Sequence, residues 1–255
     1  MSPDSVGLEI IFARFPADSA ELNGQLWEEA DEQQLPADVR QRLERNGFRQ
    51  GVIGGQVPTA LAKLLALKQE APAPGEPQRA NVAELAIKPR VTARYLQTPA
   101  GRRNEVQASG VYDRLPVLVS ESGELGGQTY CQAQAVFALA AFPQPDGRVK
   151  LDLVPEIHHD QPRQHWIGEQ AAWRLETSRP KRVFDDLKVS TLLRPGTILL
   201  LSGQPGREGS LGHYFFSEGD SQDHHVERKL LVLRVCQTQH DDLHPPALSL
   251  GVVVD

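Results

Sequence analysis

Histidines are the residues whose type and spacing come nearest to a site of chemistry in this 255-residue chain. Two groups of them lie beside carboxylates, near residues 158–165 and 223–225. Their members are His158, His159, Asp160 and His165, and Asp223, His224 and His225. Imidazole and carboxylate groups are common ligands of zinc and iron. One hypothesis for function is therefore a metal-dependent enzyme that uses His158, His159 and His165, or His224 and His225.

The spacing of these histidines argues against a metal site. Adjacent residues on a strand point to opposite faces, so His158 and His159 would not bind one ion together. The His-Glu-x-x-His spacing of helical zinc sites is absent from the sequence. Both groups, and a third at 240–244, fall in segments expected to be loops. We therefore expect solvated polar loops and assign no metal ligand.

Nucleophilic chemistry finds little support in the sequence. Ser210 and His213 stand close together in a glycine-rich stretch, without the strand-turn-helix pattern of a nucleophile elbow. Cys131 and Cys236 each lie in an apolar stretch, and we expect both to be buried as small hydrophobic side chains. The acidic pairs at 28–29 and 185–186 are expected to be solvated. The sequence thus predicts no catalytic residue, no cofactor and no enzymatic activity.

Charge and hydropathy narrow the range of partners. The chain has 27 Lys and Arg against 33 Asp and Glu, a net charge of −6, with no concentrated basic face. Nucleic acid is therefore not expected as a partner. No apolar run reaches the length of about 20 residues that a membrane-spanning helix needs. No signal peptide precedes the first strand, so the chain is expected in the cytoplasm if Met1 is its true start.

The first 68 residues are expected to form a small α/β unit. Residues 6–15 and 48–53 are rich in β-branched and aromatic side chains and predict strands. Helices are predicted after Asp18 or Ser19, from Pro36 to Asn46, and from Pro58 to Lys68. Residues 69–80 hold several prolines without periodicity and are expected to be a linker.

Residues 81–255 are expected to form a β-rich domain, which makes the fold class α+β and mainly antiparallel. Alternating apolar residues predict strands at 83–96, 114–120, 128–142 and 149–154, and the turn 143–147 joins the last two as a hairpin. Further strands are predicted at 173–177, 184–193, 197–201 and 229–235. Residues 158–169 and 203–212 are expected to be irregular, and the tail after Gln239 loose.

Four stretches follow one another in an order found in a known family. They are 6–15 with the Glu21–Trp27 segment, the pair 131–142 and 149–157 around Pro145-Asp146-Gly147-Arg148, the stretch 186–203, and the strand 228–235. Together they resemble the secretin homology domain of bacterial secretins. The hairpin, for example, is similar to the family's DGxVxLDIxPEI pattern.

The resemblance implies a structural role. In secretins these strands are shared among many protomers in a large β-barrel, a gated pore of the bacterial outer envelope used in protein secretion. The family's apolar lip would fall within 204–227, where only 209–216 are apolar, so the resemblance does not extend to a membrane-inserting lip. The stretch 31–79 is also unusual for the family.

The leading hypothesis is therefore a non-enzymatic, secretin-like component of an envelope-associated oligomeric assembly or pore. The resemblance implies a homo-oligomer, a location in the outer membrane or periplasm, and envelope or secretion-system proteins as partners. The hairpin at Asp146-Gly147 and the strand from Leu187 to Leu201 are the segments expected to pair between protomers. The alternatives are the metal-dependent enzyme above and a cytoplasmic adaptor whose N-terminal unit binds a partner protein.

Overall fold

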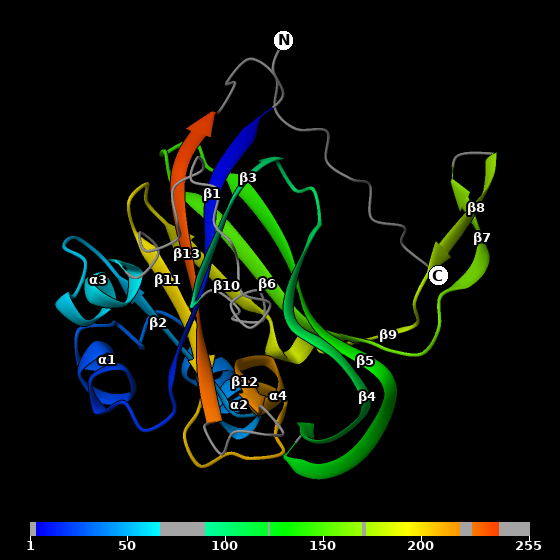
Figure 1. The fold of residues 1–255 in the computed structure, drawn as a ribbon. Coiled ribbons are helices and arrows are strands. Elements are labelled where there is room, and N and C mark those ends of the chain that lie inside the picture. The colour runs from blue at the N-terminus through cyan, green and yellow to red at the C-terminus, as the bar shows by residue number, and fades with distance from the viewer. Residues whose placement is uncertain (1–3, 67–89, 122, 170–171, 220–225, 240–255) are drawn as a thin grey trace, which may run out of the picture.

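The structure is a computed structural model that describes residues 4–66, 90–121, 123–169, 172–219 and 226–239 (Figure 1). Its fold is α+β and consists mostly of antiparallel strands, as the sequence predicted. The expected linker at 69–80, the histidines at 224 and 225, and the tail after residue 239 lie outside the described residues.

The N-terminal elements follow the sequence pattern closely. They are β1 (Ser5–Pro16), a π-helical turn (Glu21–Gln25) that continues into α1 (Leu26–Glu28), α2 (Ala37–Arg45), β2 (Phe48–Ile53) and α3 (Thr59–Ala66). Pro36 stands just before α2, and Gly47 follows it with φ of 78°, a conformation that glycine adopts without strain. Pro36 and Gly47 thus bound the α2 region as expected from the sequence.

A six-stranded sheet contains the first and the last strand that the structure describes, β1 and β13, as neighbours. Its order is β2-β11-β13-β1-β3, with β12 beside β13. The further strands are β3 (Val91–Pro99), β11 (Ile198–Gly203), β12 (Ser217–Gly219) and β13 (Val226–Gln239). The strands of the expected N-terminal unit, β1 and β2, are therefore separated in the sheet by β11 and β13. The domain boundaries at 68 and 80 stay a prediction.

A second, five-stranded sheet has the order β10-β6-β5-β4, with β9 also paired to β6. Its strands are β4 (Asn104–Glu121), β5 (Glu124–Pro143), β6 (Val149–His158), β9 (Lys181–Val183) and β10 (Val189–Leu193). The predicted hairpin is confirmed, because β5 and β6 pair from Pro143↔Val149 to Gln134↔His158. Gly147 closes its turn with φ of 77°.

The larger hydrophobic core contains buried side chains of both sheets. It includes Leu8 of β1, Phe137 of β5, Leu151 of β6 and Leu233 of β13. A second core contains Leu26 and Trp27 of α1, Leu61 of α3, and Ile198 and Leu200 of β11. Figure 1 shows α1 and α3 together beside the β2–β11 end of the larger sheet. The two sheets thus share one apolar core, and α1 and α3 pack in a second one.

Three stretches differ from the sequence prediction. Residues 158–169, expected to be irregular, contain β7 (Arg163–Glu169), which pairs with β8 (Ala172–Ser178) as a separate two-stranded sheet. The expected strand at 184–193 begins with a 3-10 turn (Asp185–Leu187). The glycine-rich loop ends in α4 (Leu211–Phe216). No helix within the described residues is long and apolar enough to cross a membrane.

Candidate functional site

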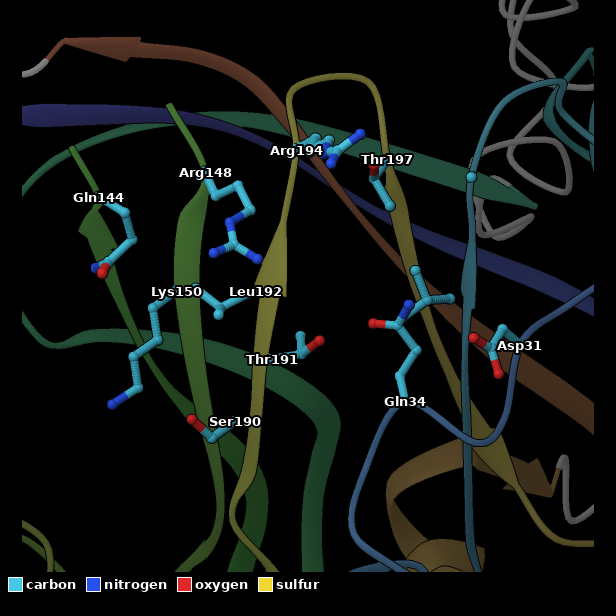
Figure 2. Close-up of a pocket in the computed structure, with 12 residues that line it drawn as sticks. Asp31, Gln34, Gln144, Arg148, Lys150, Ser190, Thr191, Leu192, Arg194 and Thr197 are labelled. Carbon is cyan, nitrogen blue, oxygen red and sulfur yellow. The ribbon is translucent and has the colours of Figure 1, made fainter. Parts of the chain in front are cut away.

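A groove of about 810 Å³ lies beside β10. We call it the edge groove; it is lined by Asp31, Gln34, Val52, Gly54, Gln144, Arg148, Lys150, Ser190, Thr191, Leu192, Arg194 and Thr197. Figure 2 shows Thr191 of β10 across the gap from Gln34 and Asp31, with Arg194 at the turn toward β11. Most of the lining residues are polar or charged, and residues more than 100 positions apart in the sequence form the groove.

The edge groove follows a free strand edge. β10 ends the five-stranded sheet and, among the strands that the structure describes, pairs only with β6, from Val189↔Leu153 to Leu193↔Val149. Along β10 the side chains alternate: Val189, Thr191 and Leu193 are buried, whereas Ser190 and Leu192 are exposed. An edge strand offers unpaired backbone N–H and C=O groups to an added strand.

Three cationic side chains lie on the groove lining. They are Arg148 and Lys150 of the hairpin and Arg194 of the turn after β10. Arg148 donates to Asp146 at 2.6 Å, and this hydrogen bond lowers the pKa of Asp146. Within the described part of the chain, Arg194 has no ion pair.

A carboxylate in the neighbouring strand organises the middle of this surface. Asp152 of β6 accepts a hydrogen bond from Ser190 at 2.7 Å and forms an ion pair with Lys188 at 2.7 Å. Lys150 stands 3.9 Å from the same carboxylate, a distance at which it contributes little. Lys188 therefore pairs directly with Asp152, whereas Lys150 lies beyond hydrogen-bonding distance of this carboxylate.

A second cluster surrounds the buried carboxylate of Glu156. His158 bonds it at 2.8 Å, Arg103 at 2.5 Å and Lys181 lies at 3.8 Å. Burial raises the pKa of Glu156, but the hydrogen bond from His158 and the charges of Arg103 and Lys181 outweigh this and lower it. Two hydrogen bonds, from His158 and Arg103, and the nearby charge of Lys181 therefore keep the carboxylate of Glu156 ionised.

The same cluster is the place where a metal ion would have to bind. Ligand atoms of Glu105, Glu156 and His158 all lie within 4.8 Å of one another. The guanidinium of Arg103 pairs with both carboxylates, so positive charge already fills the position between them. A divalent cation would have to displace it. The donor set therefore does not fit a metal centre well.

The remaining histidines do not complete a site. His159 turns to Asp160 at 3.0 Å and not to Glu156, as expected for the neighbour of His158 on a strand. The side chain of His165 and both His224 and His225 lie outside the described residues. The structure therefore brings His158 and His159 to different carboxylates.

Ser210 and His213 are joined by helix capping. Ser210 Oγ accepts from the backbone N–H of His213 at 3.3 Å and donates to the carbonyl of Arg207 at 2.5 Å. An N-cap serine satisfies the free N–H groups of a first turn, here that of α4. Both hydrogen bonds of the Ser210 hydroxyl are thus with backbone groups near the helix start. Burial lowers the pKa of His213.

The expectation of two buried cysteines is wrong. Cys131 is exposed and Cys236 is partly exposed. Cys131 precedes Gln132, whose φ of 47° interrupts the regular alternation of β5. The apolar residues around Cys131 therefore do not report which way its side chain points.

Sequence reasoning missed the edge groove. Its lining comes from the loop after α1, from β2 and from the β6, β10 and β11 regions. The only available signal was the density of cations around the two predicted turns, at Arg148 and Arg194. The apposition of β2 and β10 could not be read from local patterns.

Comparisons with known proteins found weak structural similarity to a few solved structures. No family model and no curated protein matches the sequence. Among solved structures, the type II secretin GspD of enteropathogenic Escherichia coli is 11% identical, with a TM-score of 0.27, covering 95% of this chain and 71% of that one.

Two further solved structures are similar at the same level. One is a pilotin–secretin AspS–GspD complex of ETEC, 11% identical with a TM-score of 0.26, covering 95% of this chain and 51% of that one. The other is the type IV competence pilus secretin PilQ of V. cholerae, 12% identical with a TM-score of 0.26, covering 94% and 62%. At TM-scores below 0.5 the likeness supports no conclusion about what this chain does.

Proposed function

We propose that this chain is a non-enzymatic structural component of an oligomeric assembly in the bacterial cell envelope, serving protein secretion. Copies of the chain join by pairing free strand edges, and the assembly forms a pore or a collar around one. The function needs no bond chemistry, because affinity between protomers comes from backbone hydrogen bonds and from apolar side chains along the joined strands.

The observation that carries the proposal is the open edge of β3. This nine-residue strand ends the six-stranded sheet and pairs only with β1 among the described residues. Its side chains at 92, 94, 95 and 97 are exposed, and Tyr95 is 72% exposed. Natural proteins usually shorten or cover such an edge, so a long exposed one favours pairing with another chain.

The segments expected from the sequence to pair between protomers contribute unequally. The stretch 187–201 is divided between β10, which has a free edge, and β11, whose two edges are taken by β2 and β13. The edge of β3 is therefore the one that joins copies, and a contact between two different surfaces of the chain closes into a ring when the rotation between copies allows it.

The ordered sequence motifs also support the proposal. The four stretches that resemble the secretin homology domain contain β1, the β5–β6 hairpin, the consecutive strands β10 and β11, and β13. The apolar part of 204–227 is taken up by α4, where Leu211, Phe215 and Phe216 are fully buried. The proposal therefore includes no membrane-inserting lip from these residues.

The experiment is the molar mass of the purified protein in mild detergent by light scattering, with negative-stain images of the same fraction. Rings or other multimers are expected. Tyr95→Lys, which places a charge on the open edge, should shift the protein toward monomer. Val57→Lys is the matched control, because Val57 is an exposed apolar residue outside the strands. A monomer under all conditions, including expression with any upstream domains, would overturn the proposal.

A further inference from the structure

The edge groove and the β3 edge differ in what they can accept. A strand added to β10 lies in the groove, between β10 and the segment that carries Asp31 and Gln34 (Figure 2). Such an added strand bonds the backbone of β10 and places its side chains alternately on the two faces of the sheet. The lining residues on each face therefore define the side chains that fit.

The outward face of the site is cationic at one end. Cross-strand partners share a face, so Leu192 and Lys150 lie together, as do Ser190 and Asp152. Arg194 follows Leu192 two positions later, and Arg148 precedes Lys150 by two, so both arginines stand at the turn end. Arg194 adjoins the free edge of β10, whereas Arg148 and Lys150 lie on the β6 side of β10, one strand further from that edge.

The cations at this end of the groove can bind an incoming carboxylate. The pair of Arg148 with Asp146 is exposed on both sides and screened by water, so an incoming carboxylate can compete for the guanidinium. Lys150 is 3.9 Å from its nearest carboxylate. Arg194 is without an ion pair among the described residues.

The opposite wall restricts where acid groups can lie. Asp31 stands there, with its carboxylate accepting from the backbone N–H of Gln33. An acidic side chain pointing toward that wall would meet like charge. The matching strand therefore has an acidic residue beside Arg194, an apolar residue beside Leu192, and small or hydroxyl side chains at the positions between them.

We propose that the edge groove binds an extended acidic segment of a partner protein, added as a strand to the free edge of β10, with its carboxylates against Arg194 and, at the same end of the groove, Arg148. The other open edge of this chain does not supply such a segment, because β3 contains Arg94 and neither Asp nor Glu. The inference goes beyond the proposed assembly, which pairs copies through β3.

The test uses a fluorescent peptide, Glu-Thr-Glu-Thr-Val-Thr, blocked at both ends, with polarization as the readout. Two matched peptides separate charge from strand addition: one has Lys for both Glu, and one has N-methyl groups on alternate amides. We expect the first peptide to bind and both controls to bind at least roughly tenfold more weakly. Hydrogen exchange at residues 189–193 should slow when the peptide is bound.

Variants of the full chain locate the site. Arg194→Glu should weaken binding roughly tenfold or more, and Arg194→Gln should weaken it less. Arg102→Glu is the matched control, because Arg102 is exposed and lies outside the groove. Circular dichroism melting curves confirm that each variant is folded, so a loss of binding is not a loss of structure.

Three outcomes would overturn the inference. No binding at low salt would remove the peptide site. Equal binding of the N-methylated peptide would show attraction of an acid without strand addition. Dissociation of protomers by the peptide, with no binding to the Tyr95→Lys monomer, would assign the β10 edge to a second copy. Loss of self-association alone, with peptide binding kept, would count only against the proposed assembly.

Discussion

The side-chain amide of Asn46 bonds both backbone groups of Ser120, 74 positions away in the sequence. Asn46 Nδ2 donates to the carbonyl of Ser120 at 3.0 Å, and Asn46 Oδ1 accepts from its N–H at 2.8 Å. Asn46 is 1% exposed and ends α2, whereas Ser120 stands near the end of β4. One side chain thus fastens the β4–β5 hairpin to the α2–β2 connection.

Removing that amide should destabilise the fold. We expect Asn46→Ala to lower the free energy of unfolding by about 2–3 kcal/mol, because three hydrogen bonds are lost, two with Ser120 and one with the carbonyl of Arg42, and the Ser120 groups lose their partner. Urea unfolding followed by circular dichroism measures the change. Gln33→Ala, at an exposed amide side chain, is the control and should change stability by less than about 0.5 kcal/mol. Equal effects of the two substitutions would contradict the role of Asn46.

The approach of α4 to Gly47 leaves no room for a side chain at Gly212. A Cβ added at Gly212 would lie 1.9 Å from the carbonyl oxygen of Gly47, and the Gly212 N–H donates to Asn46. We expect Gly212→Ala to cost about 3 kcal/mol or to prevent folding, because backbone atoms cannot move aside as a side chain does. Thermal melting measures the loss.

Gly54→Ala provides the comparison for Gly212→Ala. A Cβ at Gly54 meets nothing within 4 Å, and the residue follows β2 directly. We expect its melting temperature to stay within a few degrees of the parent chain. If Gly212→Ala melted at the same temperature as Gly54→Ala, the close packing of α4 on Gly47 would be wrong.

An aromatic cluster ties α4 to both sheets. The ring of Phe215 lies 4.8 Å from that of Phe137 and 5.3 Å from that of Phe48, and it is fully buried. We expect Phe215→Ala to cost about 3–5 kcal/mol by leaving a cavity between the sheets. Chemical denaturation gives the value, and Val57→Ala at an exposed apolar site should have little effect. A cost below about 1 kcal/mol would contradict the buried position of the ring.

Glu156 makes stability depend on pH in the acid range. Its pKa is lower in the folded chain than the ordinary value of 4.5, so its ionised form stabilises the fold above that pH. As the pH falls below 4.5 and through the folded pKa, the carboxyl takes up a proton and this contribution is lost. We expect Glu156→Gln to lower stability at neutral pH and to flatten its decline between about pH 5 and pH 2.

Unfolding free energies measured across that range test the prediction for Glu156. Glu29→Gln is the control, because Glu29 is exposed. Its profile should follow that of the parent chain. An unchanged acid limb in Glu156→Gln would mean that Arg103, Lys181 and His158 do not hold the carboxylate ionised.

The sequence predicted the parts of the fold that local chemistry decides. Asp146-Gly147 marks the turn of the β5–β6 hairpin, since glycine takes the φ of 77° found there. α4 was missed because Gly209 and Gly212 favour a loop, and the helix depends on burying Leu211, Phe215 and Phe216 against distant strands. Long-range packing of this kind leaves no local pattern.

The candidate site was harder to predict than the fold. The histidine pair was expected in a loop, but His158 is the last residue of β6 and His159 follows it, and the two bond different carboxylates. The edge groove depends on β2 and β10 lying opposite each other, and they are separated by more than 100 residues. Only the cations at two predicted turns, Arg148 and Arg194, were visible in the sequence.

The order β2-β11-β13-β1-β3 has a consequence for folding during synthesis. β1 is the first described strand, and its antiparallel neighbour β13 is the last, with Ser5 opposite Gln239. Pairs so distant in the chain raise the contact order, and the entropy of closing such a long loop slows folding. β1 is therefore synthesised long before β13. Until β13 is made, β3, which is synthesised sooner, is the neighbouring strand with which β1 can pair.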